Sequence, residues 1–481
     1  MQTVAHMRSH ALVVVLALFA CRKAADPQQI IDSPPDAGSE PPAPIDAGLP
    51  GATTPDAGPV DAGPDAHRMG GLGFGPFPAG PVVIYGSSQG LLEAPISASV
   101  DESENLWVVS HSALYLLQPG AKVFRRYTVQ DGLHYGPGYT ESPDITLVEG
   151  GAKGECFVGY YAHTTSTKFK DAHMWTDPFA HMGKMDQVLL QPDGKLKVNR
   201  YDLRNSNSGL YYETRTVTSM LYDHFQHPGN LYVGSNHGVT RIIPAKYYPP
   251  PHLDTDPFNT WDERQWYADH VHPVACVGKP CTGNPEEDFI TFGDWFGLAL
   301  GPDGRLWMGG LASAGAIGFR EKLDDWVQSW QPVNPFVPAF QMPPVFTPPR
   351  FGDPVNIRGV GVTPDGIVWF ASGEVEDWRG PTFGIAAWDG KHFTYFDPTA
   401  LGAIEYNILE LQALPDGRLV FGFPSSGLLV WEPGDVKGHR ITQRDGLPGE
   451  RIGRMSQDRM HDPPLLLVPT DGGLAIFRGV P

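Results

Sequence analysis

A unit of about 57 residues recurs along the chain from residue 81 to the C-terminus, and this repetition limits the fold more than any other feature. Each unit contains a short apolar strand, a turn with Asp, Gly or Asn, a second strand, a glycine before a third strand, and a fourth strand that ends in a polar loop. Each unit therefore predicts one four-stranded sheet. The seven predicted second strands are residues 106–109, 156–159, 231–234, 306–309, 368–371, 419–422 and 465–468.

The turns between the first two strands carry hairpin chemistry. Pro302-Asp303-Gly304, Pro364-Asp365-Gly366 and Pro415-Asp416-Gly417 each place Pro where it fixes φ and Gly where φ becomes positive. Third strands open on glycine at Gly315, Gly384 and other positions, and the first strands are rich in small residues, as converging inner strands require. We therefore predict an all-β, seven-bladed β-propeller over residues 81–481.

The two ends of this region are predicted to close the ring. After the third strand of the last unit, residues 474–477, only four residues remain, so its fourth strand must come from elsewhere. The candidate is the N-terminal strand near residues 82–85. It precedes Ser88-Gln89-Gly90-Leu91 much as other fourth strands precede Gln130-Asp131-Gly132-Leu133 and Asp445-Gly446-Leu447. A two-sheet sandwich explains the strands but not this relation between the ends.

These repeats resemble those of two-component regulator propellers, the periplasmic sensor modules of hybrid histidine kinases. The resemblance rests on Asp445-Gly446-Leu447-Pro448, Asp131-Gly132-Leu133 and the segment 231–238, LYVGSNHG, and it spans about residues 81–479. It implies a propeller fold and a sensor role. Neither a kinase nor an immunoglobulin-like domain follows the repeats in this sequence, so the resemblance leaves a free-standing propeller.

Residues 1–21 have the layout of a lipoprotein-type signal peptide. Arg8 precedes a run of ten apolar residues, 11–20, which ends at Cys21. Leu18-Phe19-Ala20-Cys21 resembles the lipobox of bacterial lipoproteins, in which the Cys carries the lipid, although Phe19 is bulkier than usual. An ordinary signal peptide with an incidental Cys is the alternative. We predict lipid attachment at Cys21 and an extracytoplasmic, lipid-anchored location at a bacterial membrane, in the periplasm or on the cell surface.

Residues 22–80 form a predicted disordered linker. Pro and Gly make up much of this segment, and Asp-Ala-Gly occurs at residues 36, 46, 56 and 61. Such a composition cannot bury a core, so we interpret it as a spacer between the anchor and the propeller.

The acidic balance argues against nucleic acid as a partner. Lys and Arg total 35 against 54 Asp and Glu, a formal charge of −19, which repels phosphate backbones.

The cysteines predict one disulfide. Cys276 and Cys281 are close in sequence, and an exported protein meets an oxidising compartment, so we expect them to pair within a loop. A metal site that combines them with His270 and His272 is the alternative. Cys156 precedes Phe157 in a strand and is expected to be a buried thiol.

Oxygen ligands at the predicted tunnel mouth support an enzymatic alternative. Propeller lactonases of the gluconolactonase type hold calcium at such a place, which points to Asp144, Asn356 and Asn407 for Ca²⁺. The opposing interpretation is that Asp and Asn are ordinary turn residues before a strand. Propeller lyases that inactivate streptogramins offer a second enzymatic comparison, but no His and Glu pair stands out on adjacent blades, and loop histidines such as His461 are expected to be solvated.

Long loops predict a ligand face. Insertions between second and third strands and between blades fall on one face of a propeller, and exposed aromatic side chains there suit a protein, peptide or glycan ligand. The candidate residues on this face are Trp378, His237, Tyr406, Tyr135 and Tyr139.

Taken together, these patterns predict a membrane-anchored extracytoplasmic lipoprotein that acts as a ligand- or protein-binding sensor or scaffold module. It is expected to need no cofactor and to perform no catalysis. The alternative is a propeller hydrolase or lyase with a divalent metal, Ca²⁺, at the tunnel mouth.

Overall fold

The structure is a computed structural model that describes residues 82–133, 145–161, 184–202, 217–235, 239–244, 269–271, 295–310, 313–317, 330–333, 356–373, 384–461 and 464–479. The chain divides into two units, Met1–Pro64 and Asp65–Pro481, and all described residues belong to the second. The predicted signal peptide with Cys21 and the predicted linker 22–80 lie outside the described residues.

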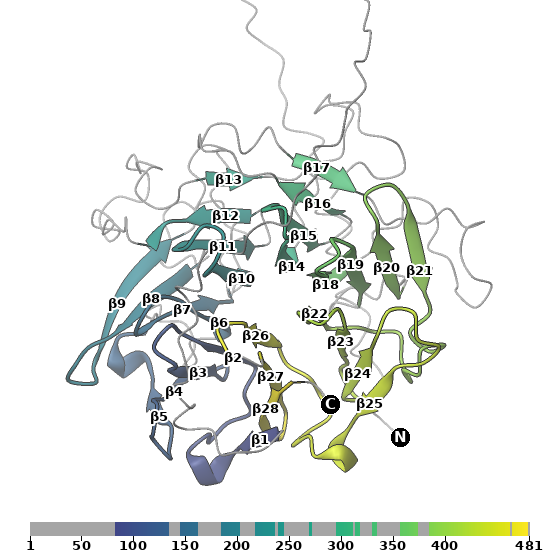
Figure 1. Cartoon of the computed structure of the whole chain (residues 1–481). Coiled ribbons are helices and arrows are strands. Elements are labelled where there is room, and N and C mark those ends of the chain that lie inside the picture. The colour runs from purple at the N-terminus through teal and green to yellow at the C-terminus, as the bar shows by residue number, and fades with distance from the viewer. Residues whose placement is uncertain are drawn as a thin grey trace, which may run out of the picture. The chain divides into compact units, whose positions relative to one another are not determined.

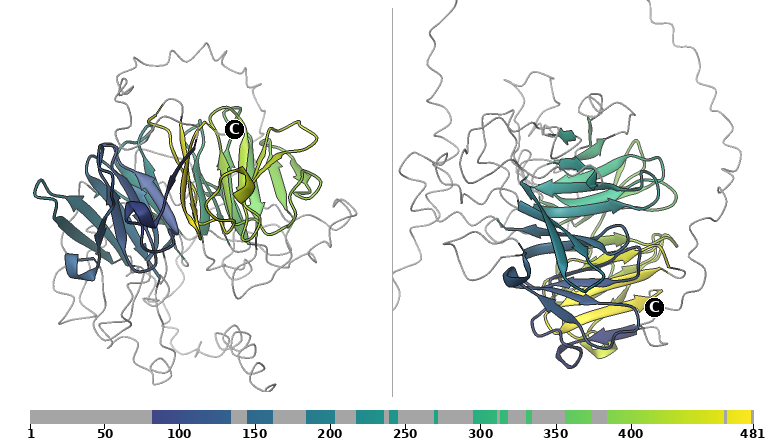
Figure 2. Two further views of the ribbon diagram at one scale, coloured as in Figure 1. Left: turned by 90° about the horizontal axis from the view of Figure 1, so that it is seen from below. Right: turned by 90° about the vertical axis from the view of Figure 1, so that its left-hand side faces the viewer.

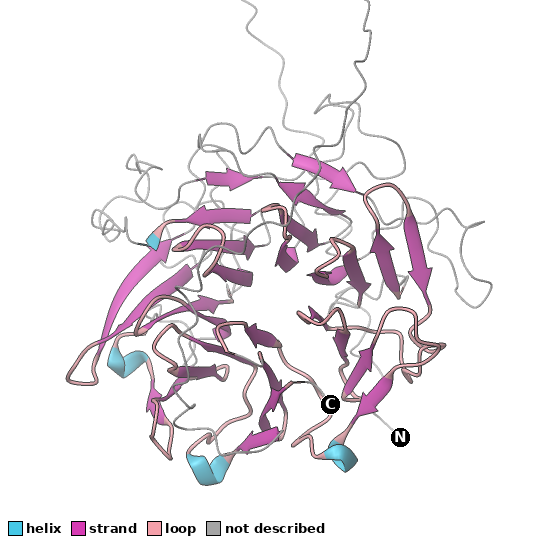
Figure 3. Ribbon diagram, in the orientation of Figure 1, coloured by secondary structure: helices cyan, strands magenta, loops and turns pink. Residues whose placement is uncertain are grey.

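The described strands form seven four-stranded antiparallel sheets around a central axis, so the prediction of an all-β propeller is confirmed (Figure 1). Within the described residues, every element other than a strand is a loop or a one-turn helix (Figure 3). We number the sheets 1 to 7 in chain order. From the inner to the outer strand, sheet 1 contains β2 (Ser97–Val100), β3 (Leu106–Val109), β4 (Leu114–Leu117) and β5 (Arg125–Tyr127); sheet 2 contains β6 (Ile145–Gly150), β7 (Glu155–Tyr160), β8 (Lys184–Leu190) and β9 (Leu196–Asp202); sheet 3 contains β10 (Val217–Asp223), β11 (Asn230–Ser235), β12 (Val239–Ile242) and β13 (Asp269–Val271); sheet 4 contains β14 (Trp295–Leu300), β15 (Leu306–Gly310), β16 (Ser313–Ile317) and β17 (Trp330–Val333); sheet 5 contains β18 (Ile357–Val362), β19 (Val368–Ser372), β20 (Ile385–Trp388) and β21 (Phe393–Phe396); sheet 6 contains β22 (Glu410–Ala413), β23 (Leu419–Gly422), β24 (Leu428–Trp431) and β25 (His439–Ile441); and sheet 7 contains β26 (Ser456–Asp458), β27 (Leu465–Thr470), β28 (Gly473–Arg478) and β1 (Val82–Tyr85).

The hydrophobic core lies between the faces of neighbouring sheets, which are seen edge-on in Figure 2. Every residue of β3 and β23 is buried, because the second strand of a sheet is covered on both faces. Between sheets 5 and 6, Trp369 and Trp431 meet edge to face with ring centroids 5.7 Å apart. Each buried side chain of this size contributes about 2–3 kcal/mol, so the apolar second strands stabilise the ring between every pair of sheets.

The predicted hairpin turns are present. Gly304, Gly366 and Gly417 have φ of 78°, 82° and 92°. The Asp before each glycine accepts a hydrogen bond from the backbone N–H two residues later, for example from Arg418 to Asp416 Oδ1 at 3.1 Å. Gly and Asp thus fix a short connection between the first and second strands, as the sequence predicts.

The Gly-Leu motif before an inner strand has the same backbone conformation at three described positions. It forms the one-turn 3-10 helices η1 (Ser87–Gln89), η2 (Val129–Asp131) and η10 (Gln443–Asp445). The glycine that follows each helix has a φ of 90° to 102°, which favours glycine. The next residue is a buried leucine, namely Leu91, Leu133 or Leu447, which ties the outer strand of one sheet to the start of the next.

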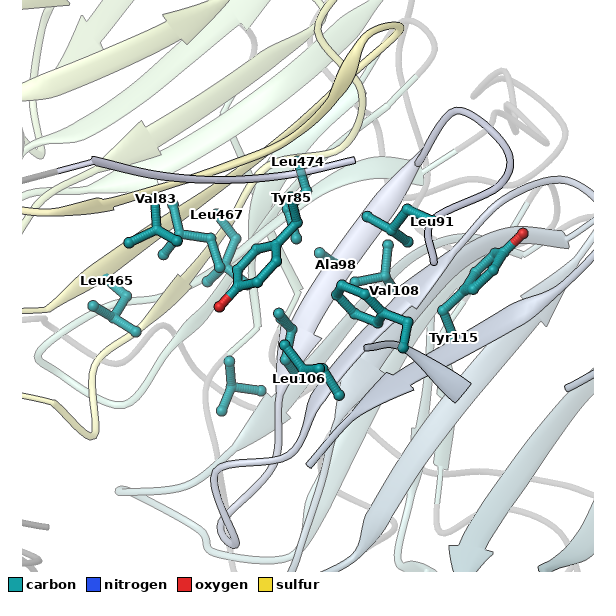
Figure 4. Close-up of a cluster of buried hydrophobic side chains, with 14 of the residues drawn as sticks. Val83, Tyr85, Leu91, Ala98, Leu106, Val108, Tyr115, Leu465, Leu467 and Leu474 are labelled. Carbon is teal, nitrogen blue, oxygen red and sulfur yellow. The ribbon is translucent and has the colours of Figure 1, made fainter. Parts of the chain in front are cut away.

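Strand β1 completes sheet 7, which confirms the prediction that an N-terminal strand closes the last sheet. Val82 pairs with Phe477 and Tyr85 with Leu474 in an antiparallel register. Figure 4 shows Val83 and Tyr85 beside Leu465, Leu467 and Leu474 of the same sheet, facing a group of sheet 1 residues. That group contains Leu91, Ala98, Leu106, Val108 and Tyr115. The two ends of the described chain are therefore joined by one hydrophobic cluster.

Two strand positions differ from the sequence prediction. β16 begins at Ser313, two residues before the glycine that was expected to open it. β22 begins at Glu410, three residues after Asn407, which the sequence indicates at the tunnel mouth. The backbone pairing of β22 starts at Leu409, whose N–H donates to the Gly422 carbonyl oxygen at 2.9 Å, so Asn407 lies before the paired segment.

Candidate functional site: a charged central tunnel

The inner strands enclose a cavity of about 200 Å³ on the central axis. Its walls come from β2, β6, β10, β14, β18, β22 and β26, and it extends to the hairpins that follow β10 and β26. Glycines keep these strands close together: a Cβ on Gly359 would lie only 2.4 Å from the Cβ of Leu411 in the next sheet. The cavity is therefore the space that remains when seven inner strands converge.

Arg454 crosses this space. It lies in the segment before β26, and its guanidinium donates hydrogen bonds to the carbonyl oxygens of Thr218 on β10 and, at 2.8 Å, of Phe296 on β14. Sheets 3 and 4 lie across the axis from sheet 7 (Figure 1). One side chain thus connects opposite walls of the tunnel, and hydrogen bonds from a charged donor contribute about 1.5–3 kcal/mol each.

Two glutamates line the tunnel near this arginine. On β6, Glu149 Oε1 accepts the backbone N–H of Tyr222 at 3.0 Å. Burial raises the pKa of Glu149 to about 7, although the Tyr222 N–H, Arg454 and the Ser99 hydroxyl all favour the charged form. The carboxylate is therefore partly satisfied by its surroundings but remains poorly hydrated.

Glu410, the first residue of β22, is less well satisfied. No hydrogen bond or ion pair reaches its carboxylate from the described residues. Burial raises the pKa of Glu410 to about 7, and the attraction of Arg454 and Arg358 does not offset this effect. A buried carboxylate without a hydrogen-bond donor lowers the stability of the folded protein. The oxygens of Glu410 can therefore still accept hydrogen bonds.

Arg358 is directed elsewhere. This residue of β18 places its guanidinium carbon 4.2 Å from the centre of the Phe296 ring on β14, a cation–π contact between sheets 5 and 4. The fixed positions of Arg358 and Arg454 explain why neither arginine bonds the Glu410 carboxylate.

A set of amide side chains continues the polar lining toward the hairpins. Gln412 on β22 donates to the Met455 carbonyl oxygen at 3.1 Å and accepts from Gln457 Nε2 at 3.0 Å. Gln457 and Arg459 both donate to the carbonyl oxygen of Ala413, at 2.9 and 3.1 Å. These bonds tie the inner strands of sheets 6 and 7 together.

Two histidines contact carboxylates at this end of the tunnel. His224 Nδ1 is 3.4 Å from Glu102 Oε1, and burial lowers the pKa of His224. His461 contacts Asp458 through Nδ1 and lies 3.5 Å from Glu104 Oε1 through Nε2. The expectation that His461 is solvated without a partner is therefore wrong, because the hairpin after β2 brings Glu104 to it from another sheet.

The predicted ligand face is mostly outside the described residues. Trp378, His237, Tyr135 and Tyr139 are not described, so their placement stays a prediction. Tyr406 is described and half-buried, and its hydroxyl lies 3.2 Å from Thr399 Oγ1 and 3.4 Å from Asp397 Oδ2. The disulfide predicted between Cys276 and Cys281 also lies outside the described residues.

Of the three residues that the calcium alternative predicts as ligands, the structure describes Asn356 and Asn407 but not Asp144. Asn356 and Asn407 both lie beside Gly373: the Asn356 carbonyl oxygen accepts its N–H at 3.1 Å, and Asn407 Oδ1 is 2.9 Å from where its Cβ would be. The Asn356 amide is buried, and its nitrogen and oxygen have no hydrogen-bond partner among the described residues. The described part of the chain contains no group of three or more His, Cys, Asp or Glu that could hold a metal.

Cys156 is fully buried between sheets 1 and 2, and burial raises its pKa, which confirms the prediction of a buried thiol.

In the described part of the chain, no helix is long and apolar enough to span a membrane.

The tunnel charges were not predicted. The charged residues in or beside the inner strands are Glu149, Arg358, Glu410 and Arg454. A charged residue among the apolar and small residues of an inner strand is the sequence signal that indicates such a position.

No protein-family model and no curated protein matches the sequence. Similar solved structures include the extracellular domains of a putative hybrid two-component system from B. thetaiotaomicron (12% identity, TM-score 0.48, 82% of this chain) and of another from the same organism (13%, 0.34, 79%). This chain spans 41% and 39% of those chains. A streptogramin B lyase is also similar (9%, 0.44, 82% of this chain and 96% of that chain). At 9–13% identity these similarities concern the fold alone.

Proposed function

We propose that the protein is an extracytoplasmic binding module, a seven-bladed propeller with each four-stranded sheet as one blade, which binds a small ligand in its central tunnel. The lipobox at Cys21 and the linker 22–80 support attachment to a bacterial membrane by a flexible tether. In this arrangement the propeller senses or holds its ligand outside the cytoplasm.

The Glu410 carboxylate carries the proposal. It faces a cavity of about 200 Å³, lacks a hydrogen-bond partner among the described residues and has a raised pKa. A tunnel that served only to close the ring needs no such group, because small or apolar residues fill the axis at lower cost. Small-molecule sites combine apolar surface with converging polar groups, and the lining of this cavity contains both.

The long-loop face stays a separate prediction. If recognition takes place there, Trp378 and Tyr406 should contribute to it, whereas the tunnel residues should not.

A fragment screen by thermal shift tests the proposal. Compounds that raise the melting temperature of the wild type should lose their effect in Leu298→Trp, because Leu298 lines the cavity and a larger side chain fills it. Leu92→Trp is the matched control, since Leu92 is 69% exposed on the outside. The double variant Trp378→Ala, Tyr406→Ala should keep the tunnel ligands.

If no compound stabilises the protein, or if Leu298→Trp folds and keeps every ligand while the double variant loses them, the tunnel is not the binding site.

A further inference from the structure

The acidic groups of the cavity outnumber the basic ones. Its lining contains four carboxylates, at Glu149, Asp223, Glu410 and Asp458, against the three guanidinium groups of Arg358, Arg454 and Arg459. Because the pKa values of Glu149 and Glu410 are both about 7, the extra carboxylate adds a negative charge to the cavity only as the pH rises above 7, and there an acidic protein with a net charge of −19 favours the entry of cations.

Two of the four carboxylates already serve the hairpins. Asp223 accepts backbone N–H bonds from residues 225, 226 and 227 at 2.8–2.9 Å. Asp458 accepts the N–H of Met460 at 2.9 Å and contacts His461. Glu149 has the Tyr222 N–H on one oxygen. Glu410 is therefore the carboxylate in the cavity with the most capacity left for a ligand.

Arg358 and Arg454 do not form hydrogen bonds with the Glu410 carboxylate. Arg454 donates to two carbonyl oxygens across the tunnel, and Arg358 stacks on Phe296. Both approach Glu410 closely enough to lower its pKa, but neither forms a hydrogen bond with it. Among the described residues no donor bonds this carboxylate, so its acceptor positions are open to solvent or to a bound molecule.

Part of the cavity wall, on two neighbouring inner strands, is suited to an apolar group. Leu298 and Leu300 on β14 and Val360 and Val362 on β18 line the same space. A cavity of about 150 Å³ accommodates benzene, so the roughly 200 Å³ available here fits an aromatic ring with a short chain.

We propose that the tunnel binds a small organic ammonium ion that carries an apolar group, with the ammonium donating hydrogen bonds to Glu410 and the apolar part lying against β14 and β18. This inference rests on the proposed function, because it names the ligand class of the same cavity. The ammonium group supplies the hydrogen-bond donors that Glu410 lacks and balances its charge.

Three probes of nearly the same shape and different charge test the proposal. Calorimetry at pH 7.5 compares 2-phenylethylamine, which is cationic, with neutral 2-phenylethanol and anionic phenylacetate. The amine should bind about tenfold or more tightly than the alcohol, the ratio that corresponds to a hydrogen bond to a charged group. Phenylacetate should bind most weakly of the three.

Two variants assign the preference to Glu410. Glu410→Gln should reduce the preference for the amine over the alcohol to about threefold or less, since the amide keeps an acceptor but loses the charge. Glu432→Gln changes an exposed glutamate in the loop directly after β24 and should leave the preference unchanged.

Equal binding of amine and alcohol would overturn this inference, and so would tighter binding of phenylacetate, which would assign recognition to the arginines. Both results would leave the tunnel as the binding site. If none of the probes binds, the ammonium inference is overturned, and the fragment screen decides separately whether the tunnel binds any ligand.

Discussion

Replacing Glu410 by Gln should stabilise the protein at alkaline pH. The carboxyl group has a pKa of about 7 in the folded protein against an ordinary value of 4.5. Because the folded pKa is the higher one, the folded protein binds this proton more tightly than the unfolded chain does. The resulting stabilisation is complete below pH 4.5 and is lost as the pH rises through 7.

The magnitude follows from the two pKa values. Their difference corresponds to about 3 kcal/mol, which the wild type loses between pH 4.5 and pH 8 and the glutamine variant does not lose. For a folded region of about 400 residues this free energy shifts the melting temperature by about 3–4 °C. Gln412, two residues along the same strand, shows that the tunnel accommodates an amide beside Glu410.

Thermal melting of both proteins at pH 5 and pH 8 tests the prediction. The variant should melt about 3 °C above the wild type at pH 8 and within about 1 °C of it at pH 5. Glu432→Gln, at an exposed site, should match the wild type at both values. A variant that melts below the wild type at pH 8, or that has the same difference at both pH values, would refute the argument that Glu410 is a desolvated and unpartnered carboxylate.

Four further changes have expected outcomes. Arg454→Met removes the hydrogen bonds across the tunnel and should cost about 3 kcal/mol in chemical denaturation; no loss would mean that the arginine does not connect the walls. Deletion of residues 82–85 exposes the edge of β28 and should lower the free energy of unfolding by about 4 kcal/mol, and a truncated protein that melts like the parent would contradict the closure of sheet 7. Asn356→Leu should leave thermal stability unchanged or raise it by about 1 kcal/mol, because the buried amide has no partner; a large loss would indicate a hidden one. Cys21→Ser should release the protein from membrane fractions, and unchanged fractionation would disprove the lipid anchor.

The architecture was predictable because it depends on short local patterns that recur. The Pro-Asp-Gly turns and the Gly-Leu motif before each inner strand specify backbone conformations within four or five residues, and the structure has those conformations at Gly304, Gly366, Gly417 and Gly446. The relation between the two ends of the repeat region then identified β1 as the partner of β28, since one sheet lacked an outer strand.

The tunnel was not predictable by the same means, because its contacts join residues far apart in the chain. Arg454 bonds carbonyl oxygens of Thr218 and Phe296, and nothing near residue 454 indicates those partners. The inner strand of sheet 6 begins three residues after Asn407, the residue that the sequence indicates at the tunnel mouth, and the acidic side chain at the cavity is therefore Glu410. In the same way, His461 was interpreted without Glu104, which reaches it from sheet 1.

A binding role also explains why a destabilising carboxylate, that of Glu410, lies in the central tunnel. Removal of the Glu410 charge should increase stability and at the same time remove the preference for a cation, a trade-off expected of binding sites. A purely structural role for Glu410 predicts no such link between stability and binding.

A crystal structure of the protein soaked with 2-phenylethylamine tests the central claim most directly. The account predicts the amine in the central tunnel, with its nitrogen within hydrogen-bond distance of a Glu410 carboxylate oxygen and its ring against Leu298 and Val360. An empty tunnel at saturating amine, or an amine bound only on the long-loop face near Tyr406, would contradict it.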